Sequence, residues 1–182
     1  RKVSEAGVRL RVLDGRAARG EPMAAMHRFY VQTFAEKWNH AAMTDAFFQH
    51  LCEALPEAVV LILAEREGEA MAGALCLRSD DTLYGRYWGA MADVPGLHFE
   101  ACYHQGIEFC IERGLRRFEP GTQGEHKISR GFEPTLTWSA HHIADARFRA
   151  AIGDYLRREA ASVDNYAAAV QSHVPYRDRR NA

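Results

Sequence analysis

The chain has 182 residues, of which 47% are hydrophobic and 26% are charged, and its formal net charge is −1. A globular protein of this length can bury one core, so we expect a single domain over residues 1–182. The balanced charge argues against an extended basic surface for nucleic acid, and no apolar run approaches the roughly 20 residues of a membrane span.

The four cysteines lie among apolar residues, and none forms a C-x-x-C pair. A free thiol in such surroundings behaves as a small hydrophobic residue, which favours a reducing compartment over a disulfide scaffold or a structural zinc site. Because the N-terminus also has no signal-peptide pattern, we expect a cytoplasmic protein. The chain begins with Arg1 rather than Met, so a longer parent protein is expected.

The N-terminal third reads as a strand followed by two helices. Alternating apolar residues over 8–13 predict a half-buried strand. Apolar residues at helical spacing then predict a helix from Pro22 to about Trp38. A second helix is predicted from the N-cap Thr44 to the breaker Pro56.

Three apolar segments follow, at residues 59–64, 70–77 and 82–88. The first is apolar throughout, as expected of a central strand covered on both faces. Short turns join the three, so they predict an antiparallel meander. Gly85 lies inside the third strand and predicts a bulge or a close backbone approach.

The next segment reads as helix, strand and loop. A strong helical pattern covers residues 97–113, and Gly114 stands where a C-terminal glycine cap belongs. A short strand is predicted at 115–118. The polar, glycine-rich stretch from Glu119 to Pro134 is predicted to be a loop.

The C-terminal part predicts a last strand at residues 135–143 and a helix that Asp145 caps and that continues through 160–170. This order predicts an α+β fold: a sandwich around a mixed, mostly antiparallel sheet flanked by helices. The periodicity of the elements predicts eight buried core residues: Trp38, Phe48, Ile62, Leu75, Ile107, Cys110, Phe148 and Ile152.

The loop from Glu119 to Pro134 gathers most of the chemistry. Glu119, Glu125 and His126 can carry a proton near neutral pH if their surroundings tune them. Lys127 and Arg130 can hold an anion such as a phosphate or a carboxylate. The alternative is a solvated surface loop. Loops carry function often, and the density of these groups favours a site.

Two other interpretations of these residues are weaker. A phosphate-binding loop needs glycine directly before its lysine and Ser or Thr after it, and Lys127 has neither. The ligands of a metal site would come from His98 and Glu100 and from Glu125 and His126, together with His141 and His142. Residues two apart on a helix and adjacent residues on a strand point away from each other, so we expect no metal.

Three strings resemble a bacterial family described as GNAT-like or FemAB-like N-acyltransferases related to peptidoglycan biosynthesis. They are His98-Phe-Glu-x-Cys-Tyr, Gly121-x-Gln-Gly-Glu-His-Lys127 and Arg130-Gly-Phe-x-Pro134. The resemblance covers nearly the whole chain and implies the fold of a GNAT acyl-CoA N-acyltransferase. Members of that family look about twice this length, so this chain resembles the C-terminal half of one.

The resemblance implies transfer of an acyl or aminoacyl group to an amine of a small molecule or peptide. The donor would be acyl-CoA, as in GNAT enzymes, or aminoacyl-tRNA, which the net charge does not support. The segment Arg86-Tyr-Trp-Gly89-Ala90-Met91 matches only the first half of the usual GNAT pyrophosphate loop. This departure weakens the case for coenzyme A.

We therefore predict that the acyl donor lies along the strand from Tyr84 to Gly89, where backbone N–H groups polarise the carbonyl group of the donor. Glu119, His126 or Glu125 is predicted to be the base. The predicted substrate-binding residues are Gln123, Lys127, Arg130, Tyr84, Arg86, Gly89 and His98. We expect the loop to meet the strand end at 85–90, and the helix that starts at Leu97 to point into the same cleft. The alternative function is a non-catalytic module that recognises an anionic ligand or peptide.

Overall fold

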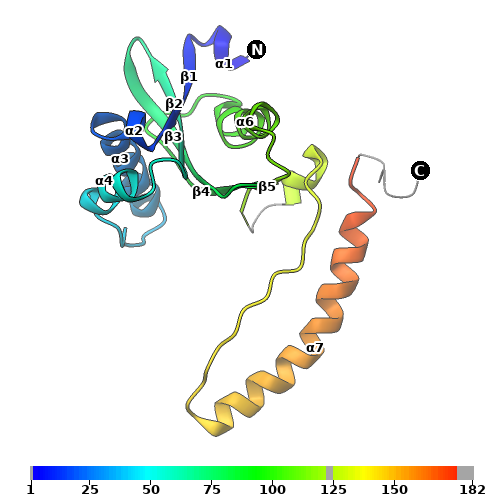
Figure 1. Cartoon of the computed structure of the whole chain (residues 1–182). Helices are drawn as coiled ribbons and strands as arrows, with labels where there is room; N and C mark the ends of the chain where they lie inside the picture. The colour runs from blue at the N-terminus through cyan, green and yellow to red at the C-terminus, as the bar shows by residue number, and fades with distance from the viewer. Residues whose placement is uncertain (1, 122–124, 176–182) are drawn as a thin grey trace. The chain divides into compact units, whose positions relative to one another are not determined.

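The computed structural model describes residues 2–121 and 125–175, and the chain divides into two compact units, residues 1–121 and 122–182. The first unit holds a sheet and the helices around it, and the second holds a short 3-10 helix and one long α-helix (Figure 1). No helix among the described residues combines the length and the apolarity that crossing a bilayer requires.

A five-stranded sheet in the order β1-β2-β3-β4-β5 forms the centre of the first unit (Figure 1). Neighbouring strands are antiparallel except for β4 and β5, which run parallel. The sheet is therefore mixed and mostly antiparallel, as the sequence predicts. The strands are β1 (Val8–Asp14), β2 (Val59–Arg66), β3 (Glu69–Arg78), β4 (Thr82–Ala90) and β5 (Arg117–Glu119).

Helices cover both faces of the sheet. One face carries α2 (Gly15–Ala18), α3 (Glu21–Glu36) and α4 (Asp45–Ala54). The other face carries α5 (Leu97–Phe99), the π-helix η1 (Glu100–His104) and α6 (Gln105–Arg113), and α1 (Lys2–Glu5) begins the chain. The layers of helix, sheet and helix are those of an α+β sandwich.

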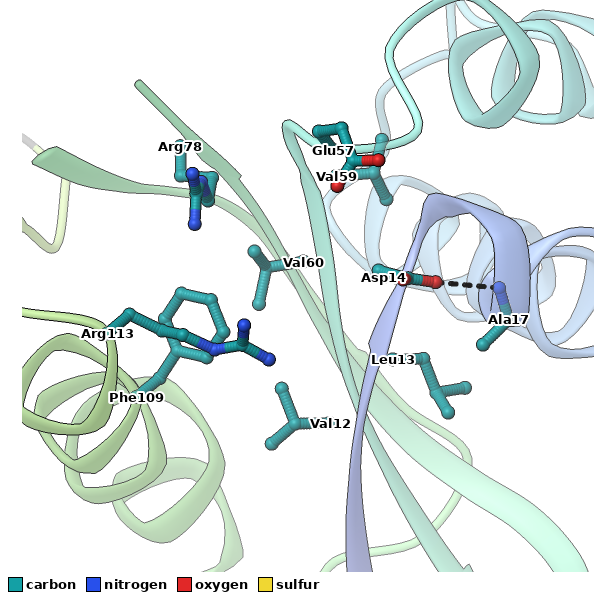
Figure 2. Close-up of a pocket in the computed structure, with 10 residues that line it drawn as sticks. All are labelled: Val12, Leu13, Asp14, Ala17, Glu57, Val59, Val60, Arg78, Phe109 and Arg113. Carbon is teal, nitrogen blue, oxygen red and sulfur yellow. Dashed lines mark hydrogen bonds between the residues drawn. The ribbon is translucent and has the colours of Figure 1, made fainter. Parts of the chain in front are cut away.

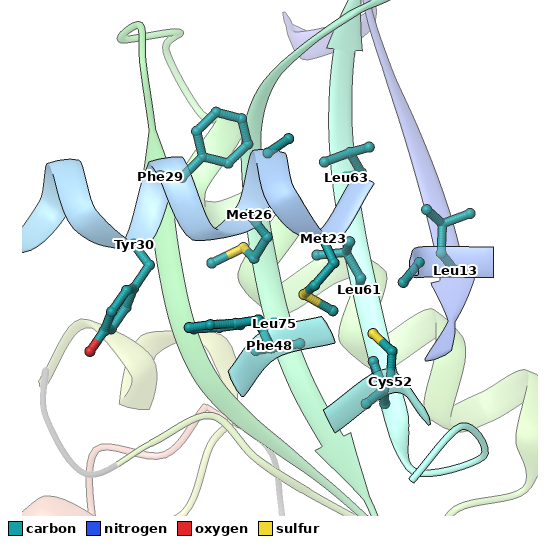
Figure 3. Packing of buried hydrophobic residues seen from close by; sticks show 13 residues of the cluster. Leu13, Met23, Met26, Phe29, Tyr30, Phe48, Cys52, Leu61, Leu63 and Leu75 are labelled. Carbon is teal, nitrogen blue, oxygen red and sulfur yellow. The ribbon is translucent and has the colours of Figure 1, made fainter. Parts of the chain in front are cut away.

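The position of β2 between two layers of helices explains why its sequence is apolar from Val59 to Ala64. Val59, Leu61 and Leu63 point to the face that carries α3 and α4, and Val60 and Ile62 point to the face that carries α6. Side chains alternate along a strand, so a central strand covered on both sides needs apolar residues at every position. Figure 3 shows the first face, where methionines of α3 and Phe48 and Cys52 of α4 pack on the sheet.

The helical segment 97–113 contains a π-turn, which the sequence does not predict. The Gln105 N–H donates to the Glu100 carbonyl oxygen, five residues back, instead of the four of a regular α-helix. Gly106 is needed there because a Cβ atom would lie 2.5 Å from the Phe118 ring. The C-cap at Gly114 is confirmed, with φ of 65°.

Half of the predicted core is confirmed. Phe48, Ile62, Leu75 and Cys110 are buried. Ile107 is 36% exposed, and the buried side of α6 is formed by Gly106, Phe109 and Cys110 instead. Trp38 is 98% exposed, since it follows the end of α3 with φ of 53°, outside the helical periodicity used to place it.

The second unit also departs from the prediction. Residues 132–143 form neither helix nor strand, so the predicted strand at 135–143 is wrong. A strand needs a neighbour for its backbone groups, and no described strand pairs with this segment. The long helix α7 (Ala146–Gln171) begins at the N-cap Asp145, as predicted. None of its residues is buried: Phe148 is 67% exposed, and Ile152 is half-buried.

Candidate functional site

The candidate site is the outer edge of β4 over residues 85–90, named here the β4 edge. β4 and β5 pair in parallel only from Thr82 with Arg117 to Tyr84 with Glu119. Beyond that pair β4 continues to Ala90, and in the described part of the chain no strand lies against its outer side. Unpaired strand edges offer N–H and C=O groups to an extended ligand.

A bulge interrupts β4 at the start of this edge. Leu75 pairs with Tyr87 and Cys76 pairs with Gly85, so Arg86 is the extra residue that faces no partner on β3. The bulge that Gly85 predicts is therefore confirmed. Bulges turn the strand and re-aim its backbone groups, and they are frequent beside active sites.

Beyond the bulge, backbone groups of β4 are directed to the open side. Met91 N donates to Met71 O at 2.8 Å, and hydrogen-bonding direction alternates along an antiparallel pair, so the groups of Trp88 and Ala90 face outward. The Thr33 hydroxyl lies 3.2 Å from the Trp88 carbonyl oxygen and 2.9 Å from that of Phe29. The single hydroxyl proton of Thr33 is therefore shared between the Phe29 and Trp88 carbonyl oxygens.

Aromatic side chains flank the edge on both faces of the sheet. On one face the Tyr87 ring lies 5.0 Å from Tyr30, centroid to centroid, and its hydroxyl lies 3.9 Å from the Met43 sulfur. On the other face His98 lies 5.4 Å from Trp88 and 5.5 Å from Tyr103. Tyr87, Trp88 and His98 are half-buried, and such rings can hold an apolar chain laid along the strand.

Close packing of neighbouring backbone explains why positions 85 and 89 are glycine. A Cβ atom on Gly89 would lie 2.4 Å from the Phe29 carbonyl oxygen, so this glycine lets α3 approach β4. A Cβ atom on Gly85 would touch the Pro120 backbone at 3.4 Å, where β5 ends. These contacts are made by the protein itself, so the backbone approach at Gly89 is to α3.

The turn between β4 and α5 covers residues 91–96. It contains Asp93 and no lysine or arginine, and the first helical N–H, that of Leu97, donates to the Val94 carbonyl at 3.0 Å. A pyrophosphate needs cations or unpaired N–H groups. This turn supplies the carboxylate of Asp93 instead. That the Leu97 end of the helix faces a ligand cleft stays a prediction.

The predicted site residues of the first unit lie together along β4. Tyr84 pairs with Glu119 at the point where β4 and β5 part, and Glu119 is exposed at the end of β5. The Arg86 guanidinium carbon lies 6.0 Å from the Tyr87 ring centroid. His98 starts the helix that follows the edge. Tyr84 and His98 lie on opposite faces of the sheet, so the structure places these residues along β4 without gathering them on one face.

The predicted residues of the second unit lie on the 3-10 helix η2 (Glu125–Arg130). Arg130 donates to the His126 carbonyl oxygen and to the Ser129 hydroxyl, and Gly131 ends the helix with φ of 88°. Lys127 is half-buried there, and His126 is exposed. Gln123 lies outside the described residues. The convergence of this helix with the β4 edge stays a prediction.

The described residues hold no group of three or more His, Cys, Asp or Glu side chains that could bind a metal. Three of the four cysteines, Cys52, Cys76 and Cys110, are poor nucleophiles. Burial raises the pKa of the Cys76 thiol to about 12 and that of Cys52 to about 11, and it also raises the pKa of Cys110. Thiols with these pKa values stay protonated near neutral pH.

Sequence reasoning missed part of this site. It gave Thr33 no role and placed Tyr103 only in the apolar stripe of its helix. The one available signal at Thr33 is a hydroxyl three residues after the buried Tyr30, close to the apolar stripe of α3. That signal cannot show that the hydroxyl reaches Trp88, which lies 55 residues away.

Solved structures with similar architecture include acetyltransferases. An aminoglycoside acetyltransferase from an uncultured soil metagenomic sample, in complex with sisomicin, has a TM-score of 0.53 and 13% identity, covering 78% of this chain and 97% of its own. Aminoglycoside N-acetyltransferase AAC(6')-Iy in complex with CoA has a TM-score of 0.51 and 13% identity, covering 76% and 95%.

The ribosomal-protein-alanine N-acetyltransferase of Brucella melitensis biovar Abortus 2308 has a TM-score of 0.53 and 15% identity, covering 76% of this chain and 98% of its own. At these identities the likeness establishes the GNAT-type fold that the sequence predicts. No curated protein matches the chain significantly in sequence. A family model described as peptidoglycan biosynthesis/recognition matches residues 1–178, and the chain therefore belongs to the FemAB-like family.

Proposed function

We propose that the chain is an N-acyltransferase that binds an acyl donor along the β4 edge and transfers the acyl group to an amine. The observation that carries this proposal is the separation of β4 from β5 after Tyr84 and Glu119, which leaves a bulged strand edge between aromatic side chains. Membership of the FemAB-like family and an acetyltransferase fold support the same reaction class.

In the proposed reaction the amine nitrogen attacks the donor carbonyl carbon directly. The C–N bond forms, the bond from the carbonyl carbon to the sulfur or oxygen of the donor breaks, and the leaving group takes up the proton that the amine loses. Backbone N–H groups beside the Arg86 bulge would stabilise the oxyanion of the tetrahedral intermediate. Direct attack agrees with the raised thiol pKa values, because a cysteine acyl-enzyme would need a thiolate.

Glu119 is proposed as the base that accepts the amine proton. It is exposed at the end of β5, next to Tyr84 and at the start of the β4 edge, within the same unit as the proposed donor site. A carboxylate can serve in this role when the acceptor amine is bound close by. His126 and Glu125 are proposed as further proton carriers, with Lys127, Arg130 and Gln123 as anchors for an anionic part of either substrate.

The proposed donor is a thioester or an aminoacyl ester. Asp93 in the turn before α5, together with the lack of Lys and Arg there, disfavours a pyrophosphate at that turn. We therefore propose that the donor is held mainly through its acyl arm along β4. The acceptor is proposed to be a small-molecule or peptide amine, as in the aminoglycoside-bound relative.

The test is an acyl-transfer assay with acetyl-CoA and with an aminoacyl-tRNA, each against a panel of amines. For Glu119→Gln we expect kcat to fall by about 100-fold, since general base catalysis contributes on the order of 10²–10⁴. The melting temperature should change little because the side chain is exposed.

Glu112→Gln on the exposed side of α6 is the matched control and should keep full activity. If Glu119→Gln retains wild-type kcat, Glu119 is not the base. If neither donor supports transfer by the wild-type chain, a non-catalytic binding module is favoured. The turn at residues 91–96 lacks the cations that a coenzyme A pyrophosphate would need, and this observation favours loss of catalysis.

A further inference from the structure

A pocket of about 230 Å³ lies at the end of the sheet opposite to the β4 edge (Figure 2). The strand pairs at the two ends of the sheet show that the pocket and the β4 edge are apart. The pocket is at the end where Asp14 pairs with Val60 and Arg78 pairs with Leu83. The β4 edge ends at the far side, where Ala90 pairs with Ala72. The pocket is thus a separate place on the same unit.

Its lining combines an apolar floor with charged groups on two sides. Val60 and Phe109 are buried, at 2% and 8% exposure, and Val12 completes the apolar surface. Figure 2 shows Arg78 and Arg113 on one side and Glu57 and Asp14 on the other. The two arginines come from β3 and from the last turn of α6.

The carboxylates already have partners, whereas the guanidinium groups do not bind any carboxylate in the described part of the chain. Asp14 accepts a hydrogen bond from Ala17 N at 2.8 Å as the N-cap of α2. Glu57 pairs with Arg16. Arg113 lies over the Phe109 ring, 5.6 Å from its centroid. The partner of Asp14 is a neutral amide, so Arg78 and Arg113 face one carboxylate without a cationic partner, and the net charge that faces the pocket is positive.

We propose that this pocket binds a small carboxylate with an apolar body. A guanidinium group matches a carboxylate with two parallel hydrogen bonds, so Arg78 and Arg113 suit this head group. The apolar body would lie mainly on Val12, which is 41% exposed, with the nearly buried Val60 and Phe109 beneath it. A phosphate dianion fits less well because Asp14 and Glu57 line the other side and repel extra negative charge. The volume lies below the usual range for drug-sized ligands, which also favours a small molecule.

The test is isothermal titration calorimetry on the full chain with phenylacetate, with its neutral isostere phenylacetamide and with inorganic phosphate. Phenylacetate should bind more tightly than either of the others. Arg78→Gln and Arg113→Gln should each weaken phenylacetate binding by about tenfold or more, because each removes a charged hydrogen-bonding group. Arg9→Gln removes the same charge from an exposed position of β1 and should leave the affinity within about twofold.

Thermal unfolding of every variant checks that it folds. If Arg113→Gln fails to fold, Arg113→Lys replaces it: lysine keeps the charge and the stem over Phe109 but loses the planar fork, so weaker binding is still expected. Three results would overturn the proposal. They are no binding of phenylacetate, equal binding of the amide or of phosphate, and an affinity unchanged by Arg78→Gln and by the Arg113 variant.

Discussion

The first unit and helix α7 place their apolar residues in opposite environments. β2 buries six consecutive residues, Val59 to Ala64, between two layers of helices. α7 has 26 residues, and none of them is buried. Its order rests on local contacts such as the Asp145 cap and the hydrogen bond of Tyr155 to Glu159. Most helical stability in proteins comes from packing, so the difference predicts that folding free energy is concentrated in the first unit.

The largest expected effect comes from removing one phenylalanine from each region. Phe48 is fully buried on α4 against Tyr30 and Tyr87, and Phe48→Ala should lower the free energy of unfolding by about 3–5 kcal/mol. Phe148 is 67% exposed on α7, and Phe148→Ala should change it by less than about 0.5 kcal/mol. Urea unfolding followed by circular dichroism measures both. A large loss for Phe148→Ala would show that α7 is packed in solution.

The next prediction compares two glycine-to-alanine substitutions, which should change the free energy of unfolding in opposite directions. A Cβ atom on Gly89 would collide with the Phe29 backbone, so Gly89→Ala should destabilise by about 1–3 kcal/mol. On Gly153 in α7 a Cβ atom would meet only an Arg157 nitrogen at 3.7 Å. Gly153→Ala should therefore strengthen the helix by about 0.5–1 kcal/mol. The comparison fails if both variants shift the melting temperature in the same direction.

The smallest effect concerns the turn between β3 and β4. The Thr82 hydroxyl donates to Asp81 Oδ1 at 2.8 Å, and this hydrogen bond holds the pKa of Asp81 below its usual range. A carboxyl group with a lowered folded-state pKa stabilises the fold above its unfolded-state pKa, and this contribution is lost as the pH falls through the folded-state value.

Asp81→Asn should therefore be less stable than the wild type at pH 7, with the difference shrinking in the acid range. Melting temperatures of the two proteins across that range test the sign. Thr82→Val removes the donor and should flatten the same part of the curve. A gap that widens as the pH falls would contradict the assignment.

Local sequence determined most of the elements of the first unit. The continuous apolar run at Val59, the cap at Gly114 and the bulge near Gly85 each follow from the chemistry of a few neighbouring residues, and each is confirmed. The candidate site was predictable only in part. Tyr84, Arg86 and His98 lie along one strand and the helix after it, whereas Thr33 reaches Trp88 from a separate helix.

Tertiary structure alone decided the rest, because it depends on residues far apart in the chain. The parallel pairing of β4 with β5 brings Glu119 to Tyr84, and the packing of α6 on the sheet buries Gly106, Phe109 and Cys110 but not Ile107. Arg78 and Arg113 face one pocket only after β3 and α6 pack on the same sheet. The pattern of a strand at 135–143 had no neighbouring strand to complete its hydrogen bonds. Periodicity and capping act within a few residues, whereas strand partners, helix phase and charge pairing are set by contacts that only the folded chain makes.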